Sequence, residues 1–295
     1  MRIGIYGHPV LLENKQFIIQ FFNYLTELDA EVYIFKSFYE FLKKDFSFKA
    51  QIKGYFNSFL DFPDDLDLVF SIGGDGTVLE TASIIRNKGV PVAGINSGRL
   101  GFLANISKVQ IEKAIKTIFN RNFTIENRAL LELKNNGNLF NDFNIALNEI
   151  TIHKKDNSSM ISIDTFVNDE LLTTYWADGL IISTPTGSTA YSLSVGGPIV
   201  VPQSKNIIIA PIASHNLTMR PIVLPDNAEI RLKLHGRENS FLVSLDYRSE
   251  NFDGKDELII CRAGYDFKMI KLPNTSFFKT IRTKMMWGID KRNRN

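Results

Sequence analysis

Several features are scarce in this sequence. Cys261 is the single cysteine among 295 residues, so no intrachain disulfide can form and a reducing compartment is indicated. The four histidines are scattered and show neither the H-x-x-x-H nor the H-E-x-x-H spacing of zinc sites. No apolar run approaches the roughly 20 residues of a membrane span, and the first residues enter a strand pattern without the apolar segment of a signal peptide. We therefore expect a soluble, cytoplasmic protein with no membrane partner.

The sequence also lacks an excess of charge of one sign and three common sequence motifs of functional sites. The chain has 34 Lys and Arg residues against 32 Asp and Glu residues, a net charge of +2. Nucleic-acid-binding proteins usually carry a strong basic excess, so nucleic acid is not an expected partner. The patterns G-x-x-x-x-G-K-[ST], G-x-S-x-G and, after the first strand, G-x-G-x-x-G do not occur. Their absence argues against a P-loop kinase, a serine hydrolase and a dehydrogenase.

The segments that are present predict two architectures. In the first third, strand-like runs at 3–6, 31–35, 68–72 and 90–95 alternate with helix-like segments, which predicts a Rossmann-like α/β domain with a parallel sheet. From about residue 120 onward, short strand-like runs follow one another between turn signals such as Asn135-Asn136-Gly137, which is typical of an all-β domain. We expect an α/β domain over 1–120 and a β-rich domain over 121–272. A short helix is expected at 276–287, and the polar residues 290–295 are expected to fray.

Residues 73–77, with the sequence GGDGT, form the most informative segment. They follow an apolar strand-like run and precede a helix-like run, so glycines and a helix N-terminus meet where a phosphate-bearing ligand would bind. The carboxylate of Asp75 would repel a phosphate and needs another role. It can act as a general base toward a hydroxyl group or as a ligand of Mg²⁺. The alternative is a tight turn in which Asp75 caps the helix.

Two further segments suit a ribose or a phosphate. Residues 185–194 (PTGSTAYSLS) place small hydroxyl residues and a glycine after a strand, with Asp178 just before that strand. A turn capped by Ser or Thr would have the same composition. Asn148 and Glu149 combine an amide and a carboxylate, which suit the two hydroxyls of a ribose. Polar residues on the solvent face of a strand are the alternative.

A third glycine-rich turn, at 94–103, follows the strand-like run at 90–95. Arg99 in this turn has forked donors that suit a phosphate. It can equally face solvent as an ordinary loop residue.

Taken in order, these segments resemble the NAD kinases. The resemblance rests on GGDGT, the turn at 96–103, Asn148-Glu149, the run at 178–192 (DGLIISTPTGSTAYS) and the stretch at 211–223. GGDGT alone is shared with diacylglycerol kinases and phosphofructokinases, whereas the run at 178–192 is much more specific. The match extends over nearly the whole chain.

The resemblance implies transfer of the γ-phosphoryl group of ATP to the 2′-hydroxyl of the adenosine ribose of NAD, giving NADP. It implies Mg²⁺ and a homo-oligomer, a dimer or a tetramer, with the homotetramer common. It also implies that residues 273–295 fold back and complete the N-terminal domain. A lipid or sugar kinase that shares only GGDGT and a non-catalytic nucleotide-binding regulator are the alternatives.

Carried over by position, Asp75 is the general base. The nucleotide is expected to contact Gly74, Asp75, Gly76, Asn148, Glu149, Asp178, Thr186, Ser188, Thr189, Ala190, Tyr191, Ser192, Leu193 and Ser194. This chain departs from the family pattern at three places. Trp176 and Glu80 stand where many relatives have a basic residue, the first of these positions being associated with the choice between NAD and NADH. Asp246-Tyr247-Arg248 replaces a common Asp-Gly-Gln, so the glutamine contact is not expected.

Overall fold

The structure is a computed structural model that describes residues 1–48, 50–98, 101–134, 139–140, 143–155, 160–236, 240–273 and 275–288. It divides into two compact units, unit 1 comprising Met1–Asn127 with Lys268–Asn295, and unit 2 comprising Arg128–Phe267. Three expectations lie outside the described residues: the phosphate contact of Arg99, the turn at 135–137 and the frayed end at 290–295.

Unit 1 is built on a mainly parallel sheet. Its strands within the described residues are β1 (Arg2–Gly7), β2 (Glu31–Phe35), β3 (Gly54–Phe56), β4 (Leu68–Gly73), β5 (Val92–Asn96), β6 (Ile106–Ser107), β7 (Thr124–Arg128) and β20 (Phe267–Lys271). The order is β3-β2-β1-β4-β5-β20-β7, with β6 beside β5. The pairs β1–β2, β1–β4 and β4–β5 are all parallel. The predicted α/β domain is confirmed.

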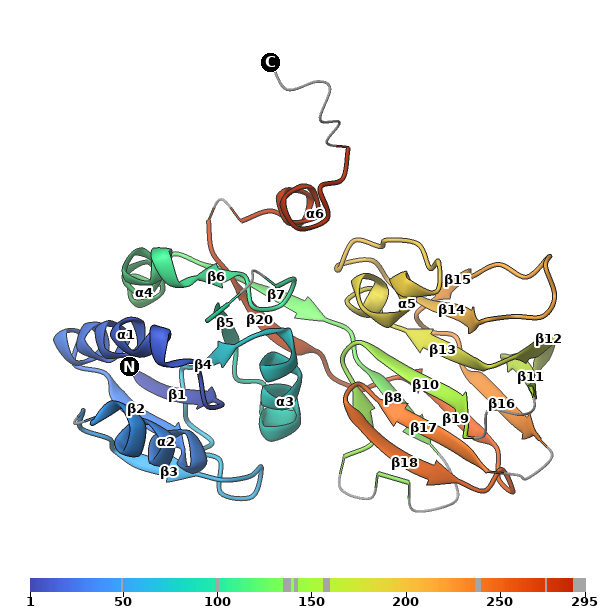
Figure 1. The fold of residues 1–295 in the computed structure, drawn as a ribbon, viewed down its shortest axis with the longest axis horizontal. Coiled ribbons are helices and arrows are strands. Elements are labelled where there is room, and N and C mark those ends of the chain that lie inside the picture. The colour runs from blue at the N-terminus through green and yellow to red at the C-terminus, as the bar shows by residue number, and fades with distance from the viewer. Residues whose placement is uncertain are drawn as a thin grey trace. The chain divides into compact units, whose positions relative to one another are not determined.

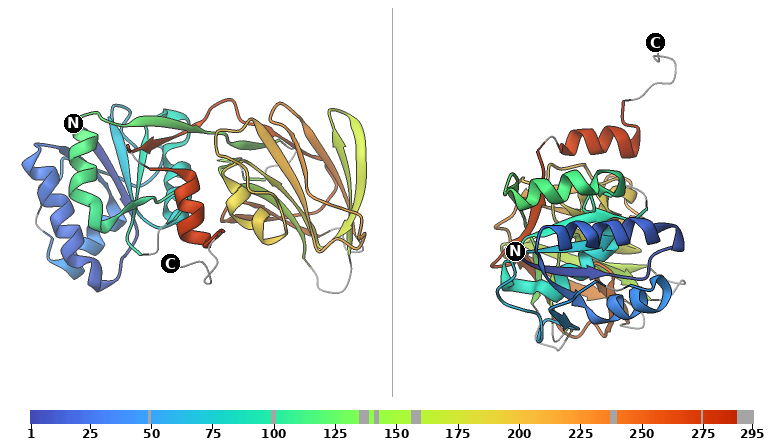
Figure 2. Two further views of the ribbon diagram at one scale, coloured as in Figure 1. Left: turned by 90° about the horizontal axis from the view of Figure 1, so that it is seen from above. Right: turned by 90° about the vertical axis from the view of Figure 1, so that its left-hand side faces the viewer.

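Helices cover both faces of this sheet. The helices of unit 1 within the described residues are α1 (Lys15–Glu27), α2 (Lys36–Phe46), α3 (Asp75–Ile85), α4 (Ile111–Phe119) and α6 (Phe277–Met285), with single 3₁₀ turns η1 (Leu12–Asn14), η2 (Arg86–Lys88) and η3 (Lys108–Gln110). Apolar side chains of α1, α2 and α4 form one cluster with β1, β4 and β5, and α3 lies on the other side of the sheet from α1 and α4 (Figure 1). Figure 2 shows α1 and α4 side by side, where the Tyr24 hydroxyl donates to Glu112 at 3.1 Å. Among the helices of the described part, none has the length and apolar stretch needed to cross a membrane.

The strand order places the GGDGT segment at a position favoured for ligands. The chain runs outward from β1 to β2 and β3, then returns to the other side of β1 as β4. In open parallel sheets, ligands bind beyond the carboxyl ends of the strands at this point of reversal. Strand β4 ends there and leads directly into α3, so residues 73–77 lie at the switch point.

The division between the units differs from the boundary predicted near residue 120. Strand β7 extends unit 1 to Asn127 because it joins the same sheet beside β20. Strand β20 comes from the end of the chain and pairs in parallel with β5, Met269 opposite Val92. The sequence did not single out this strand, which falls within the bounds 121–272 expected for the β-rich domain. The described residues that follow β20, including α6, are grouped with unit 1.

Unit 2 is a sandwich of two antiparallel sheets. Its strands within the described residues are β8 (Leu131–Lys134), β9 (Ile145–Ala146), β10 (Glu149–Lys154), β11 (Ile161–Val167), β12 (Glu170–Ala177), β13 (Gly179–Ser183), β14 (Asn206–Ile212), β15 (Ile222–Pro225), β16 (Ile230–His235), β17 (Phe241–Leu245), β18 (Arg248–Phe252) and β19 (Leu258–Arg262). The sheet orders are β15-β14-β13-β10-β17-β18 and β12-β11-β16-β19-β8-β9. Alternate residues of β16 and β17 are buried, so the two inner faces share one apolar core. The predicted all-β domain is confirmed.

A short helical segment follows β13 in unit 2. It consists of η4 (Gly187–Thr189) and α5 (Tyr191–Ser194). Just beyond it, Val195 packs against Ile181 of β13 and Ala210 of β14, away from the main core. Alternation along β13 directs Ile181 to the outer face, so the segment covers that face.

Candidate active site

The GGDGT segment begins α3 through its glycines. Gly74 is the N-cap residue, and its N–H donates to Thr77 Oγ1 at 3.3 Å. A Cβ at Gly73 would lie 2.1 Å from Thr77 Oγ1, whereas a Cβ at Gly74 or Gly76 would meet nothing within 4 Å. Gly73 therefore serves packing, and the other two glycines leave open space over the first turn of the helix. Since Gly74 occupies the cap position, the interpretation of Asp75 as the helix cap is wrong.

The Asp75 carboxylate is held by a neighbouring loop. Its Oδ2 accepts the N–H of Phe102 at 2.8 Å, and its Oδ1 accepts those of Leu103 and Ala104, both at 2.9 Å. A carboxylate oxygen offers about two lone pairs, so Oδ1 is saturated and Oδ2 retains one. The side chain is 31% exposed, and the Lys284 ammonium lies 3.6 Å from Oδ2. The oxygen that can still accept a proton is thus accessible and fixed in position.

Gly101 makes room for this carboxylate, so Gly101→Ala is expected to lower the free energy of unfolding by about 1–3 kcal/mol. A Cβ at this position would lie 1.8 Å from Asp75 Oδ1 and would displace it. Urea unfolding measures the change. Gly98→Ala is the matched control in the same turn, because its Cβ would meet nothing within 4 Å. Equal losses in both variants would contradict the packing described.

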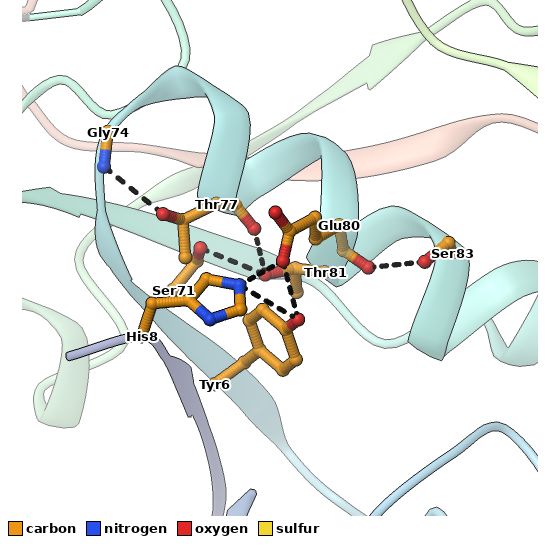
Figure 3. Close-up of polar contacts among 8 residues, drawn as sticks. All are labelled: Tyr6, His8, Ser71, Gly74, Thr77, Glu80, Thr81 and Ser83. Carbon is orange, nitrogen blue, oxygen red and sulfur yellow. Dashed lines mark hydrogen bonds and ion pairs between the residues drawn. The ribbon is translucent and has the colours of Figure 1, made fainter. Parts of the chain in front are cut away.

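The inner face of α3 carries a polar cluster (Figure 3). The Tyr6 hydroxyl donates to Glu80 Oε2 at 2.8 Å, and His8 Nε2 pairs with the same oxygen. Deeper in the sheet, the Thr81 hydroxyl lies 2.9 Å from Ser71 Oγ. Glu80 stands at a position where the family resemblance leads one to expect a basic residue, and here its carboxylate binds Tyr6, which lies in β1, and His8, which follows β1. The Glu80 carboxylate thus has hydrogen-bond partners within unit 1.

In unit 2, Asp246 positions the start of β10. Its carboxylate accepts the N–H groups of Leu147 at 2.8 Å, Asn148 at 2.7 Å and Glu149 at 3.2 Å. Removal from water raises the pKa of the Asp246 carboxyl group, while the three backbone N–H groups oppose that shift. Asp246 occupies a two-residue hairpin turn with φ 53°, a conformation that Asp tolerates better than most residues. Its next-but-one neighbour Arg248 donates to nearby backbone carbonyls, so this departure from the family pattern serves the fold.

Glu149 is a buried carboxyl group with an altered proton affinity. Its side chain is almost fully enclosed, and Oε2 is buried without a hydrogen-bond partner among the described residues. Burial, and to a lesser degree the charge of Asp246, raise the pKa of Glu149 to about 8, although the backbone N–H of Tyr191 opposes the shift. Glu149 is therefore mostly protonated at neutral pH and can donate a hydrogen bond.

The Ser- and Thr-rich segment at 185–194 packs against Asn148. A Cβ at Gly187 would lie 2.1 Å from the Asn148 carbonyl oxygen, so only glycine fits there. The hydroxyl of Ser188 donates to the carbonyl of Pro185 at 2.7 Å and accepts the N–H of Val200 at 3.0 Å. The Ser188 hydroxyl therefore stabilises the turn through hydrogen bonds to its backbone.

Exposure divides the predicted contacts of this segment. Thr186, Ser188 and Ser192 are buried. The other five are at least partly exposed: Thr189, Ala190, Tyr191, Leu193 and Ser194. The Tyr191 ring stacks on His153 at 5.8 Å between centroids. The exposed members are the ones that a ligand can reach without rearrangement.

Asp178 lies at the other end of the β10–β13 pair from Glu149. Glu149 is opposite Ser183, whereas His153 is opposite Gly179, a separation of about 13 Å along the strands. Asp178 forms an ion pair with Lys154 at 2.6 Å. Burial lowers the pKa of His153, and the charge of Asp178 opposes this shift. In unit 2, Asn148 and Glu149 therefore lie at the end of the strand pair next to Gly187, and Asp178 lies at the end next to His153.

The sequence assigned no site role to three residues that the structure places at these groups. Lys284 reaches Asp75, Asp246 positions Asn148 and Glu149, and His153 stacks on Tyr191. Polar residues at alternate positions of a strand, 149, 151 and 153, were a signal for His153. The other two depend on pairings between distant segments, for which the sequence carries no local signal.

Comparison with known proteins identifies the family. The model of the ATP-NAD kinase N-terminal domain matches residues 3–123, and that of the ATP-NAD kinase C-terminal domain matches residues 147–272. The chain belongs to the NAD kinase family. Relatives include the NAD kinase of Flavobacterium johnsoniae, 45% identical over 296 residues, and that of Bacteroides fragilis, 46% identical over 294 residues. Each alignment covers 99% of this chain and 100% of the relative.

Solved structures share the fold of this NAD kinase family member. Yeast NADH kinase complexed with NADH superposes with a TM-score of 0.86 at 24% identity, covering 100% of this chain and 90% of that one. An NAD kinase from Archaeoglobus fulgidus in complex with ATP gives 0.75 at 24% identity, covering 96% and 99%. The full-length match to NAD kinases lends no support to a lipid or sugar kinase.

Proposed function

We propose that this chain transfers the γ-phosphoryl group of ATP to the 2′-hydroxyl of the adenosine ribose of NAD and so makes NADP, with Asp75 as the general base. The observation that carries the proposal is the carboxylate of Asp75, held by three backbone N–H groups with one lone pair of Oδ2 unused. Phosphoryl transfer depends on positioning and charge neutralisation more than on covalent help. A fixed carboxylate oxygen suits removal of the hydroxyl proton as the bond to phosphorus forms.

The dinucleotide and ATP contacts are proposed for the residues carried over from the family. Gly74 and Gly76 leave open space over the first turn of α3, and a helix N-terminus attracts phosphates. Asn148 offers an amide and protonated Glu149 a hydroxyl for ribose oxygens. Asp178 and the exposed residues of the segment at 186–194 complete the set. A related structure in complex with ATP and another with NADH carry the same fold.

Mg²⁺ is proposed to enter with ATP. Within the described ranges, no three His, Cys, Asp or Glu side chains gather as a metal site would require. Three of the lone pairs of Asp75 are occupied by backbone N–H groups, so this carboxylate does not fit the role of a principal metal ligand. Mg²⁺ is commonly held by substrate phosphates and water with few protein groups. Bound in this way, it would neutralise phosphate charge.

A homo-oligomer, a dimer or a tetramer, is proposed from the resemblance, and a cytoplasmic location from the sequence features described above. Size-exclusion chromatography with light scattering would measure the oligomer. A monomer at micromolar concentration would contradict the proposed assembly.

Turnover gives the direct test of the proposed function. The purified protein, incubated with Mg-ATP and NAD, is expected to produce NADP, which an NADP-specific dehydrogenase detects. Parallel assays with NADH as acceptor measure the preference between NAD and NADH, the choice with which the position of Trp176 is associated in the family. Absence of NADP above background with freshly prepared, folded protein would refute the proposed activity.

A further inference from the structure

The last helix contributes a charged side chain to the Asp75 site. Phe277, Ile281 and Lys284 stand at i, i+4 and i+7 and share one face of α6. Ile281 is 2% exposed, so this face of the helix is buried at its centre. The Phe102 ring lies 6.3 Å from that of Phe277, and the Lys284 ammonium lies 4.5 Å from the centre of the Phe102 ring. The helix is therefore packed on the loop whose N–H groups hold Asp75.

The contact between Lys284 and Asp75 involves one particular oxygen. The ammonium lies 3.6 Å from Oδ2, the atom that retains a free lone pair. At that distance the two charges attract each other but form no hydrogen bond, so the lone pair of Oδ2 stays available. The lysine side chain is 36% exposed and borders the open side of the site.

The first turn of α3 presents opposite charges to an anion. Its free N–H groups attract a phosphate, whereas the carboxylate of Asp75 in the same turn repels it. Glu80, one turn further along, is already paired with His8. The charge of Asp75 is the one that must be offset before a triphosphate can approach, and Lys284 is the cation next to it.

We propose that Lys284 is a residue of the ATP site that acts through Asp75, its ammonium offsetting the carboxylate charge so that the triphosphate can bind beside the base. The inference rests on the proposed function, since it takes ATP as the anion. Lys284 leaves the proton-accepting lone pair of Oδ2 free and removes the net repulsion. The C-terminal helix is in this way part of the active site.

Binding of a non-hydrolysable ATP analogue, measured by isothermal titration calorimetry, provides the first test. Lys284→Met keeps an unbranched apolar chain over Phe102 and removes the charge. It is expected to weaken the Kd roughly five- to tenfold at low ionic strength, and less at high salt because exposed charges are screened. Lys284→Arg keeps the charge and is expected to restore binding. Lys279→Met, an exposed lysine on the same helix, is the control and is expected to bind like wild type.

A double variant separates action through Asp75 from direct contact with the phosphates. In Asp75→Asn/Lys284→Met neither charge is present, so the net charge equals that of the wild-type pair. Its Kd for the analogue is expected to return to within about twofold of wild type. The deciding comparison is with Asp75→Asn alone: if Lys284 acts through Asp75, the double variant binds the analogue as tightly as Asp75→Asn does. If Lys284 instead contacts the phosphates itself, the double variant binds roughly five- to tenfold more weakly than Asp75→Asn, and the proposal is overturned.

The same variants distinguish this proposal from loss of the fold and from failure of the proposed function. Steady-state kinetics of Lys284→Met are expected to show a raised KM for ATP, with KM for NAD unchanged within about twofold. Thermal unfolding of every variant is recorded in parallel, and a destabilised helix would affect Lys284→Arg as well. A wild-type protein that makes no NADP refutes the function. A wild-type protein that makes NADP while Lys284→Met has the same Kd and KM for ATP refutes the role of Lys284.

Discussion

Asp75→Asn is expected to lower kcat by roughly 10²- to 10⁴-fold, with a much smaller loss of NAD affinity. The amide has nearly the same shape, and its oxygen can still accept the N–H groups of Leu103 and Ala104. It has no basic lone pair with which to take a hydroxyl proton. The nitrogen also cannot accept the N–H of Phe102, so about 1 kcal/mol of stability is lost. Stopped assays of NADP formation measure kcat, and calorimetry measures NAD binding.

Asp61→Asn supplies a matched control for this substitution. Asp61 is likewise a carboxylate that accepts backbone N–H groups, from Asn57 at 2.9 Å and Ser58 at 2.7 Å. It follows β3, which lies three strands from β4, about 14 Å across the sheet. The variant is expected to lose stability but to keep wild-type kcat. Near-wild-type turnover in Asp75→Asn would mean that another group takes the proton.

The parts of the fold and the site that follow from local sequence were predictable. Apolar runs, glycine turns and helix starts are encoded by neighbouring residues, so a strand, a glycine-rich turn and a helix were expected in this order. The helix α3 begins at Asp75, inside the GGDGT segment that was expected to precede it. The change from alternating to all-β architecture was visible for the same reason. Family resemblance added the return of the chain end, which periodicity does not encode.

Contacts between distant segments could not be predicted in this way. Asp246 holds backbone N–H groups that are 97 to 99 residues away, and a hairpin turn containing an aspartate looks the same whatever it faces. Ser188 satisfies its hydroxyl inside its own turn, yet a serine bound to a ligand would have an identical sequence signal. Strand register and burial decide whether such a side chain supports the fold or binds a ligand, and both are set only when the strands pair.

Glu149→Gln is expected to make stability less sensitive to pH. The pKa of Glu149 is raised from 4.5 to about 8 in the folded protein. Between these values the folded chain keeps a proton that the unfolded chain has lost, so the free energy of unfolding falls as pH rises and levels off above about 8. At 1.36 kcal/mol for each pKa unit, the loss from this group between pH 6 and pH 9 is about 2–3 kcal/mol. Glutamine does not titrate, and the variant should lack this part of the loss.

Urea unfolding at pH 6 and at pH 9 measures the difference. Glu257→Gln is the control, because hydrogen bonding to Lys233 and nearby positive charges lower the pKa of Glu257. Any change in stability from the titration of Glu257 therefore occurs below pH 6. Wild type and Glu257→Gln should therefore lose stability in parallel, while Glu149→Gln loses less. If Glu149→Gln also runs parallel to wild type, Glu149 is already ionised in the folded protein. It would then be a hydrogen-bond acceptor, and its proposed donation to a ribose oxygen would be excluded.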